Sequence, residues 1–362
     1  MEVCSHNFND PQTVSIKVSE TDCNLNCAYC YCSETKTEFK KNKFFDVNNF
    51  KQAISLLPKN TAIIFIGGEP TLIGKELLLN FINIIRENNF SIKPSILTNG
   101  YLADEWVDFF YENSDKLKLT VSIDGDEISN NFRISKDNNK VFNKVNDFIK
   151  SIDKKNIEFR CIATVNSISC FRAEHVMEHF SQYNNLKFLK LNPCYDTSED
   201  QLKTFAIRPN EYLKFLKQCL QIWVKKRMYY KFELEPFSSI LKDKDSSQNF
   251  EFKCPKFLSL YSNGDFFLCD TIKKQVDNKP IDIYEFNNNF QFEKFYPYYF
   301  KDEIDDCKKC NNIRICKGGC PEIKHRLREC GNEFIKEYCF YRKTIREITT
   351  NFIRYFKIND TK

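Results

Sequence analysis

The chain has few histidines and contains no stretch that resembles a targeting or membrane-spanning segment. Only four histidines occur among its 362 residues, which weakens any scheme based on zinc–histidine ligation or a histidine base. Residues 1–11 are polar and lack the apolar core of a signal peptide. No apolar run approaches the roughly 20 residues that a bilayer requires. We therefore expect a cytoplasmic protein.

A strong excess of charge of one sign is also missing. The chain has 54 basic and 49 acidic residues and a formal net charge of +5, which is too small to demand a nucleic-acid partner. The basic cluster of residues 225–227 and Lys231 is more typical of a solvated helix face than of a binding patch. We expect neither nucleic acid nor membrane among the partners.

Cysteine, in contrast, is abundant. Seventeen cysteines occur in a chain that has no recognisable secretion signal. Disulfides are disfavoured in the cytosol, so clustered thiols there indicate metal binding or catalysis. Because histidine is so scarce, iron–sulfur ligation is the simplest interpretation.

Strand-like and helix-like segments alternate through the first two thirds of the chain. The apolar or β-branched runs that predict strands are residues 13–19, 61–66, 92–97, 117–123, 157–165 and 188–192. The amphipathic segments that predict helices are residues 47–57, 76–87, 104–112, 141–153, 173–183 and 210–226. This order predicts an α/β fold with a parallel sheet, curled into a partial (β/α)6 TIM-like barrel. The repeat stops before the eight units of a full barrel.

The composition and periodicity of the sequence change near residue 230. Helical periodicity fades, and cysteines and glycines accumulate in segments that cannot build a large apolar core. Metal ligation can substitute for such a core. We expect a main domain over residues 1–230 and a linker with a cysteine-rich domain over residues 231–362. Residues 243–249 are expected to form an exposed loop near the boundary, and residues 338–356 a helix.

Three cysteines follow the first predicted strand in a C-x3-C-x2-C spacing. They are Cys23, Cys27 and Cys30, in the run DCNLNCAYC. Three thiolates can hold three irons of a four-iron, four-sulfur cluster and leave the fourth iron without a protein ligand, whereas a cluster that only transfers electrons usually takes four cysteines. An open iron can bind a small molecule, so the spacing indicates catalysis. Cys32 falls outside the spacing and is interpreted as a bystander thiol.

A second motif, GGEPT at residues 67–71, follows the second predicted strand. Gly67 and Gly68 permit close approach of a ligand to the backbone, and Glu69 offers an acceptor for an ammonium group. Alone, two glycines that end a strand usually form only a turn. The TNG run at residues 98–100 is consistent with a site but less specific. With the cysteine spacing, these features make residues 13–195 resemble the radical S-adenosylmethionine (SAM) superfamily.

The resemblance implies a cofactor and a set of residues that bind it. Cys23, Cys27 and Cys30 would hold a [4Fe-4S] cluster with exchangeable SAM. The residues implied as SAM contacts or neighbours are Tyr29, Gly67, Gly68, Glu69, Ser122, Asp124, Arg133 and Leu191. Glu69 would bind the amino group, Ser122 the ribose, Arg133 the carboxylate and Leu191 the adenine. A surface arginine and a core leucine are the plain alternatives for the last two.

The chemistry that the resemblance implies is reductive cleavage of SAM. The resulting 5′-deoxyadenosyl radical would abstract hydrogen from a substrate, while the protein positions the cofactor and excludes competing reactions. The electron would come from a low-potential donor such as flavodoxin or ferredoxin. We therefore expect a radical SAM oxidoreductase.

The C-terminal cysteines form a second pattern. Cys254-x9-Gly264-x4-Cys269 is followed by Cys307-x2-Cys310-x5-Cys316-x3-Cys320 and then by Cys339. This spacing resembles the seven-cysteine SPASM domain of radical SAM enzymes that modify peptides and proteins. The resemblance implies two auxiliary [4Fe-4S] clusters. An outer set would comprise Cys307, Cys310, Cys316 and Cys339, and an inner set Cys254, Cys269 and Cys320.

The inner set is one ligand short of four. Relatives that mature sulfatases supply a further cysteine between the first cysteine and the glycine, but residues 255–263 contain none. Either Cys330 fills this gap, or the site stays open and can bind a substrate thiolate. The alternative to auxiliary clusters is a zinc-ribbon site at Cys307, Cys310, Cys316 and Cys320, because two close cysteine pairs often bind zinc.

Asp270 directly follows Cys269. In sulfatase-maturing relatives an aspartate at this position is the proton acceptor during substrate oxidation, and a shielded pocket could raise its pKa toward that of a useful base. An aspartate that caps a loop turn is the alternative. The cysteines outside both patterns are interpreted as small buried residues; they are Cys4, Cys161, Cys170, Cys194 and Cys219.

Three functions remain open from the sequence. The first is a radical SAM/SPASM maturase that modifies a side chain or forms a crosslink in a ribosomally synthesised peptide, which the missing inner ligand favours. The second is a sulfatase-maturase-like enzyme that oxidises Cys or Ser to formylglycine. Asp270, the compact length and the lack of room for a leader-binding domain before the first strand favour this second function. The third is a non-catalytic iron–sulfur or zinc-bound interaction protein.

Overall fold

The structure is a computed structural model that describes most of the chain. The described residues are 13–30, 45–195, 204–242, 257–269, 280–284, 301–316 and 318–359. Cys4, Cys32, Cys254 and Asp270 lie outside these ranges, as does the expected exposed loop over residues 243–249. The chain divides into two compact units. Unit 1 comprises Met1–Ser122, Arg133–Phe159 and Lys253–Tyr299, and unit 2 comprises Ile123–Phe132, Arg160–Phe252 and Phe300–Lys362.

Unit 1 contains a mostly parallel sheet in which the strand order is β4-β3-β2-β1-β8-β9. The strands are β1 (Thr13–Lys17), β2 (Ala62–Ile66), β3 (Ser95–Thr98), β4 (Lys118–Ser122), β8 (Phe257–Leu260) and β9 (Phe266–Leu268). Strand β1 pairs in parallel with β2 on one side and with β8 on the other, and β9 returns antiparallel to β8. The C-terminal third of the chain thus contributes β8 and β9 to the sheet that contains β1, the strand that precedes the cysteine loop.

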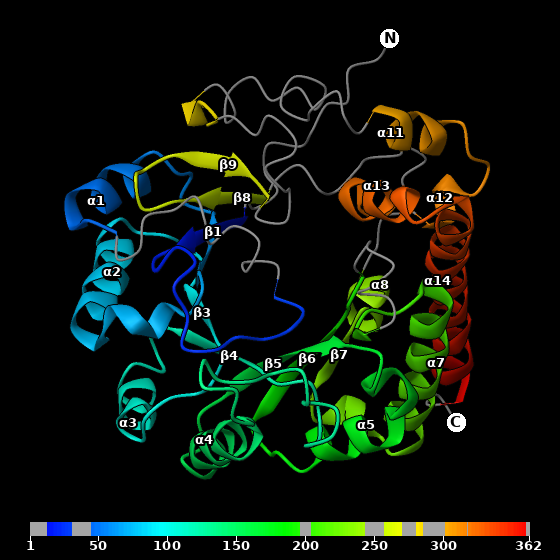
Figure 1. Cartoon of the computed structure of the whole chain (residues 1–362), viewed down its shortest axis with the longest axis horizontal. Coiled ribbons are helices and arrows are strands. Elements are labelled where there is room, and N and C mark those ends of the chain that lie inside the picture. Colours follow the sequence, from blue (N-terminus) through cyan, green and yellow to red (C-terminus); the bar gives the residue numbers. More distant parts are fainter. Residues whose placement is uncertain are drawn as a thin grey trace. The chain divides into compact units, whose positions relative to one another are not determined.

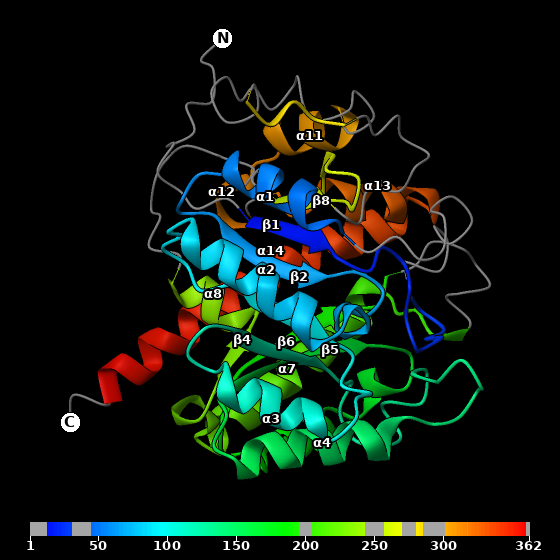
Figure 2. The ribbon, with the colours of Figure 1, turned by 90° about the vertical axis from the view of Figure 1, so that its left-hand side faces the viewer.

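Four helices of unit 1 lie on one face of strands β1 to β4 (Figures 1 and 2). They are α1 (Val47–Ser55), α2 (Lys75–Glu87), α3 (Glu105–Glu112) and α4 (Phe142–Lys154). Each forms because apolar residues recur at helical spacing; in α2, Leu78, Phe81, Ile82 and Ile85 are buried. The ring of Phe81 stacks on Phe50 of α1 at 4.1 Å between centroids. The carboxylate of Asp46 caps α1 by accepting from the backbone of Asn48 and Asn49.

Unit 2 contains strands β5 (Phe159–Val165), β6 (Leu186–Pro193) and β7 (Glu233–Glu235), in the order β7-β6-β5. Its first helices are α5 (Ala173–Ser181), α7 (Pro209–Lys225) and α8 (Phe237–Lys242). The later helices are α11 (Lys301–Lys308), α12 (Ile313–Cys316), α13 (Pro321–Glu329) and α14 (Asn332–Asn359). Helices α7 and α14 run side by side (Figure 1), and α13 packs against α14.

The predicted α/β class and all six expected strand–helix pairs are confirmed. Strands β7 to β9 and the short helices α8 and α11 to α13 were not predicted. Helix α14 begins at Asn332, earlier than the expected residue 338, and its buried stripe includes Phe334, Tyr338, Tyr341 and Ile345. Within the described residues, no helix is long and apolar enough to cross a membrane. The predicted domain boundary at residue 230 stays a prediction.

Candidate functional site

The three predicted cluster ligands lie on the loop that follows β1 in unit 1. Cys23, Cys27 and Cys30 are half-buried thiols, and the backbone N–H of Cys30 donates to the carbonyl of Cys27 at 3.1 Å. Burial raises the pKa of the Cys23 thiol to about 11, although the backbone N–H of Leu25 donates to its sulfur and opposes this; the neighbouring charges of Glu69 and Cys27 add to the rise. Reduced, partly accessible thiols on one loop are a donor set that fits an iron–sulfur cluster.

The GGEPT loop after β2 supports the cysteine loop directly. The backbone N–H of Gly68 donates to the Glu20 carbonyl at 2.8 Å, and that of Glu69 donates to the Asp22 carbonyl at 2.7 Å. A Cβ atom on Gly68 would lie 1.9 Å from the Asp22 oxygen, which no side chain can tolerate. The sequence predicted that Gly68 lets a ligand approach the backbone closely. In the structure, the group that lies close to Gly68 is instead the backbone of Asp22, next to Cys23.

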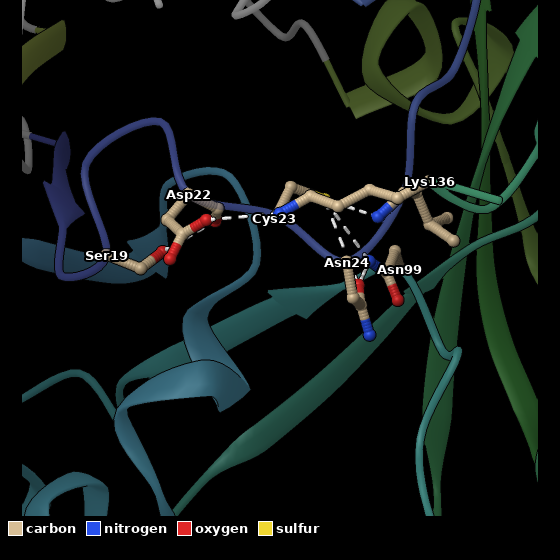
Figure 3. A network of polar contacts seen from close by, with 7 residues as sticks. Ser19, Asp22, Cys23, Asn24, Asn99 and Lys136 are labelled. Atoms are coloured by element: carbon tan, nitrogen blue, oxygen red, sulfur yellow. Dashed lines mark hydrogen bonds and ion pairs between the residues drawn. The ribbon is translucent and has the colours of Figure 1, made fainter. Parts of the chain in front are cut away.

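Segment 133–136 holds the cysteine loop in addition. The backbone N–H of Asn26 donates to the Ile134 carbonyl at 2.8 Å, and Leu25 forms a β-bridge with Ser135. The Lys136 ammonium lies 3.4 Å from the Asp22 carboxylate, as Figure 3 shows. This ion pair is exposed and contributes little stability by itself, but the backbone contacts fix the path of the chain around Cys23.

Glu69 is fully buried, and its carboxylate is held by four donors. Oε1 accepts from Thr71 N (3.1 Å), Thr71 Oγ1 (2.7 Å) and Thr98 Oγ1 (2.8 Å), and Oε2 accepts from Asn99 N (2.7 Å). Burial raises the pKa of Glu69, while the hydrogen bonds from Asn99, Thr71 and Thr98 oppose this rise. The carboxylate is thus fixed in one orientation in a shielded position, where an ammonium group is bound more strongly than in water.

Asn99 joins this carboxylate to the cysteine loop. Its side-chain Nδ2 donates to Cys23 Sγ at 3.5 Å and to Asn24 Oδ1 at 2.7 Å (Figure 3). From the sequence, the TNG run that contains Asn99 was only weakly indicated as part of the site. The available signal was position: Asn99 directly follows β3, and the carboxyl ends of neighbouring parallel strands meet at one edge of a sheet.

Arg133 and Tyr29 belong to the same network. The Arg133 side chain is 6% exposed; it donates to the Tyr29 hydroxyl at 3.4 Å and to the Asn99 carbonyl at 3.5 Å. The surface-arginine alternative therefore does not apply. Ser122 ends β4 and is half-buried. Unit 1 brings together six of the eleven residues predicted for the cluster and SAM: Cys23, Tyr29, Gly67, Gly68, Glu69 and Arg133.

Two predicted SAM contacts, Asp124 and Leu191, lie in unit 2. The carboxylate of Asp124 accepts from Thr164 N at 2.9 Å, and its own N–H donates to Asn130 Oδ1 at 3.1 Å. Leu191 is 2% exposed, and its carbonyl accepts from the Tyr212 hydroxyl. Both residues have clear structural roles within unit 2, and their roles toward SAM stay predictions.

The second cysteine field is gathered in unit 2. Cys307 lies in α11, Cys310 in the turn after it, Cys316 at the end of α12 and Cys339 in α14. Burial raises the pKa of Cys339; Lys324 lowers it, and the nearby Cys307, Cys316 and Cys310 raise it further. The four members of the predicted outer set are therefore close enough to influence one another.

Cys320 is the member of the predicted inner set that lies in unit 2. It precedes α13, and its N–H donates to the Tyr338 hydroxyl at 3.1 Å. Across the described ranges, no three His, Cys, Asp or Glu side chains are arranged to hold a single metal ion. A zinc ribbon needs four ligands on one ion at about 2.3 Å from each sulfur, and the choice between zinc and auxiliary clusters at these cysteines stays a prediction.

Lys324 of α13 was not predicted as a site residue. Its side chain is 4% exposed, and its Nζ contacts the sulfur of Cys307, which is 5% exposed. Lysines are almost never fully buried unless they are paired. The structure thus places a cation among the four predicted outer ligands.

Cys330 does not complete the inner set together with Cys320. The nine residues of α13 separate the two cysteines, which lie at opposite ends of this helix. At 1.5 Å per residue the two Cα atoms are about 15 Å apart, more than one cluster and two cysteine side chains can span. Cys269 lies in unit 1, where Gly264 (φ +90°) forms the turn between β8 and β9 and the N–H of Cys269 donates to the Phe257 carbonyl.

Comparison with known proteins places the same residues in context. Residues 14–146 match a family model described as a 4Fe-4S single cluster domain. A cysteine-type anaerobic sulfatase-maturating enzyme from Clostridium perfringens is 27% identical over 93% of this chain and 95% of its own length. The homologues of this chain are anaerobic sulfatase-maturating enzymes. The resemblance to radical SAM enzymes and the expected enzyme class are confirmed by these relatives.

Solved structures show that the fold is shared. The sulfatase-maturating enzyme anSMEcpe, solved with bound AdoMet and Cp18Cys peptide, has a TM-score of 0.73 at 24% identity and covers 94% of this chain and 100% of its own. SuiB from Streptococcus suis, solved with S-adenosylmethionine, has a TM-score of 0.64 at 14% identity and covers 88% of this chain and 74% of its own. Both likenesses establish the fold and leave the substrate of this chain open.

Proposed function

We propose that this chain is a radical SAM/SPASM maturase that modifies a side chain of a ribosomally synthesised peptide. The observation that supports this most is the connected network of Cys23, Asn99, Glu69 and Arg133 at the loops that follow β1 to β4. When bound, the cluster and SAM would supply a 5′-deoxyadenosyl radical that takes a hydrogen atom from the substrate. A low-potential flavodoxin or ferredoxin would supply the electron.

The residues of unit 1 provide binding and orientation. Cys23, Cys27 and Cys30 would hold the cluster. The buried Glu69 carboxylate would accept the SAM ammonium group, since its two oxygens are already oriented by Thr71, Thr98 and Asn99. The buried Arg133 guanidinium would pair with the SAM carboxylate, because planar guanidinium groups bind carboxylates at two points. Opposite charges at these two positions would fix the direction in which SAM binds.

The second field would hold two auxiliary clusters. Cys307, Cys310, Cys316 and Cys339 would hold the outer cluster, and their mutual proximity in unit 2 supports this set. Cys254, Cys269 and Cys320 would hold the inner one. Helix α13 separates Cys330 from Cys320, which supports an inner cluster with three cysteines and a position that a substrate thiolate can take.

Formylglycine formation is the second candidate, and the full-length similarity to sulfatase-maturating enzymes favours it. In this case Asp270 would accept the proton that the substrate side chain loses when it is oxidised to the aldehyde. The missing inner ligand favours the peptide maturase. Both candidates share the SAM site, so they differ in substrate and product alone.

The shared part of the proposal is tested first. Anaerobically reconstituted protein incubated with SAM and dithionite should produce 5′-deoxyadenosine, and Cys27→Ala should abolish it. Cys161→Ala is the matched control, because Cys161 is buried in β5 and lies outside both cysteine patterns. Equal production by native protein and Cys27→Ala would contradict the proposal, as would zinc without sulfide in the purified protein.

The product distinguishes the two candidates. The Cp18Cys peptide, which is bound in the solved anSMEcpe structure, is incubated with the active protein and the product is analysed by mass spectrometry and aldehyde trapping. Conversion of its cysteine to an aldehyde would establish formylglycine formation. An unchanged Cp18Cys peptide, together with modification of a short peptide encoded beside the gene, would establish the peptide maturase.

A further inference from the structure

Asn99 makes more contacts with predicted site residues than any role as a simple turn residue requires. Its backbone N–H donates to Glu69 at 2.7 Å, its carbonyl accepts from Arg133 at 3.5 Å, and its side chain donates to Cys23 and Asn24. Asn99 is 8% exposed. The backbone N–H of Asn99 therefore binds the carboxylate of Glu69, and its side-chain N–H binds the sulfur of Cys23. Both acceptors are predicted contacts of the cofactor.

The orientation of the Asn99 amide is fixed by its neighbours. Its Oδ1 accepts from Tyr101 N at 2.8 Å, so the Nδ2 group must face Asn24 and Cys23. The side chain of Asn24 is fixed in turn, because its own Nδ2 donates to the Tyr101 carbonyl at 3.0 Å and leaves Oδ1 toward Asn99. This closed ring of contacts, part of which Figure 3 shows, determines which end of the amide meets the sulfur.

The charge around Cys23 gives this hydrogen bond a consequence. Asn99 Nδ2 places a hydrogen-bond donor 3.5 Å from the Cys23 sulfur, where it favours negative charge, whereas the Glu69 carboxylate on the other side of Asn99 disfavours negative charge there. A reduced cluster carries one more negative charge than an oxidised one, and hydrogen bonds to the sulfurs are among the factors that set cluster potentials. A carboxylate that is suited to bind the SAM ammonium thus makes reduction harder, and the Asn99 donor offsets this effect.

We propose that Asn99 is a positioning residue for the cluster, which orients the Cys23 sulfur and raises the reduction potential of the cluster through its N–H···S hydrogen bond. The proposal rests on the proposed function, since it needs a cluster at Cys23, Cys27 and Cys30. It gives the TNG run at the end of β3 a role in tuning the cluster, which is separate from the roles of the cysteine loop and the GGEPT loop.

Asn99→Asp separates this role from a role in the turn. An aspartate keeps the acceptor for Tyr101 N and nearly the same shape, but it replaces the donor to Cys23 with a negative charge. Asn99→Ala removes the donor without adding charge. Asn113→Asp is the matched control, since Asn113 is a buried asparagine (5% exposed) whose amide donates to the Phe109 carbonyl at the end of α3.

The measurement is an anaerobic redox titration of reconstituted full-length protein followed by electron paramagnetic resonance. The spectrum of Cys27→Ala is subtracted to remove signals from other clusters. We expect the midpoint potential to shift to more negative values in Asn99→Ala and further in Asn99→Asp, and to stay at the native value in Asn113→Asp.

Two outcomes would overturn the proposal. One is a native midpoint in both Asn99 variants with full iron content. The other is loss of the cluster from both variants while their circular dichroism stays native, which would leave Asn99 with a purely structural role. Failure of the proposed function is recognised separately, because native protein and Cys27→Ala would then have the same iron content and the same spectrum.

Discussion

The α-carbon of Gly68 packs against the Asp22 carbonyl so closely that a Cβ atom would lie 1.9 Å from that oxygen. The Gly68→Ala substitution must therefore push the GGEPT loop away from the cysteine loop, since the overlapping atom belongs to the backbone. We expect a loss of stability of about 1–3 kcal/mol, as overpacking typically causes, together with loss of most of the iron held by Cys23, Cys27 and Cys30. Urea unfolding and iron quantification after reconstitution measure the two effects.

Gly74→Ala is the control for this prediction. Gly74 has φ +85° and ψ 160° but open space around its Cβ position, so alanine there introduces backbone strain of about 1–3 kcal/mol without displacing the cysteine loop. Iron content should stay native. Equal iron loss in both variants would show that general destabilisation, and not the contact with Asp22, controls cluster loading.

Glu69→Gln should weaken SAM binding about 10- to 100-fold, because a charge-assisted hydrogen bond contributes about 1.5–3 kcal/mol. The amide must also present its N–H groups toward donors, since both Glu69 oxygens accept hydrogen bonds from Thr71, Thr98 or Asn99. Equilibrium SAM binding to reconstituted protein tests this. Glu76→Gln in the exposed first turn of α2 serves as control, and native affinity in Glu69→Gln would remove Glu69 from the SAM site.

The sequence predicted those features of the site that depend on position along parallel strands. The cysteine loop, the GGEPT loop and Asn99 follow β1, β2 and β3, and strand ends of one sheet meet at one edge. The contact between Gly68 and Asp22 could not be predicted, because it depends on loop paths. The pairing of β8 with β1 was equally out of reach; the hydrogen bond from Ser15 to the Leu258 carbonyl spans 243 positions. Lys324 was missed because the segment PEIKHRLRE has the charged composition of an exposed helix.

Cys339→Ala should remove the iron of the outer auxiliary cluster, whereas Cys330→Ala should leave it in place. Cys339 is within electrostatic reach of Cys307, Cys316 and Cys310, while Cys330 lies outside the predicted outer set. Iron and sulfide content per chain, together with Mössbauer spectra, measures the loss. If Cys330→Ala loses as much iron as Cys339→Ala, the ligand assignment in unit 2 is wrong.

Lys324→Met should have opposite effects on the protein without and with its outer cluster. Without the cluster, Lys324 is a buried cation beside a thiol whose pKa is raised by burial, and burying a charge is costly. Methionine fills similar space, so we expect the cluster-free protein to gain about 1–3 kcal/mol of stability. With the cluster bound, the Lys324 ammonium faces an anionic cluster that is held by Cys307. Removing this positive charge should speed the release of iron to a chelator.

Two measurements on the same variant check this reversal of sign. Urea unfolding of cluster-free protein gives the stability, and the rate of iron release from reconstituted protein gives the effect on the cluster. Lys309→Met, at an exposed position after α11, should change neither. A Lys324→Met protein that releases iron no faster than native protein would show that the buried ammonium does not stabilise a cluster at Cys307, Cys310, Cys316 and Cys339.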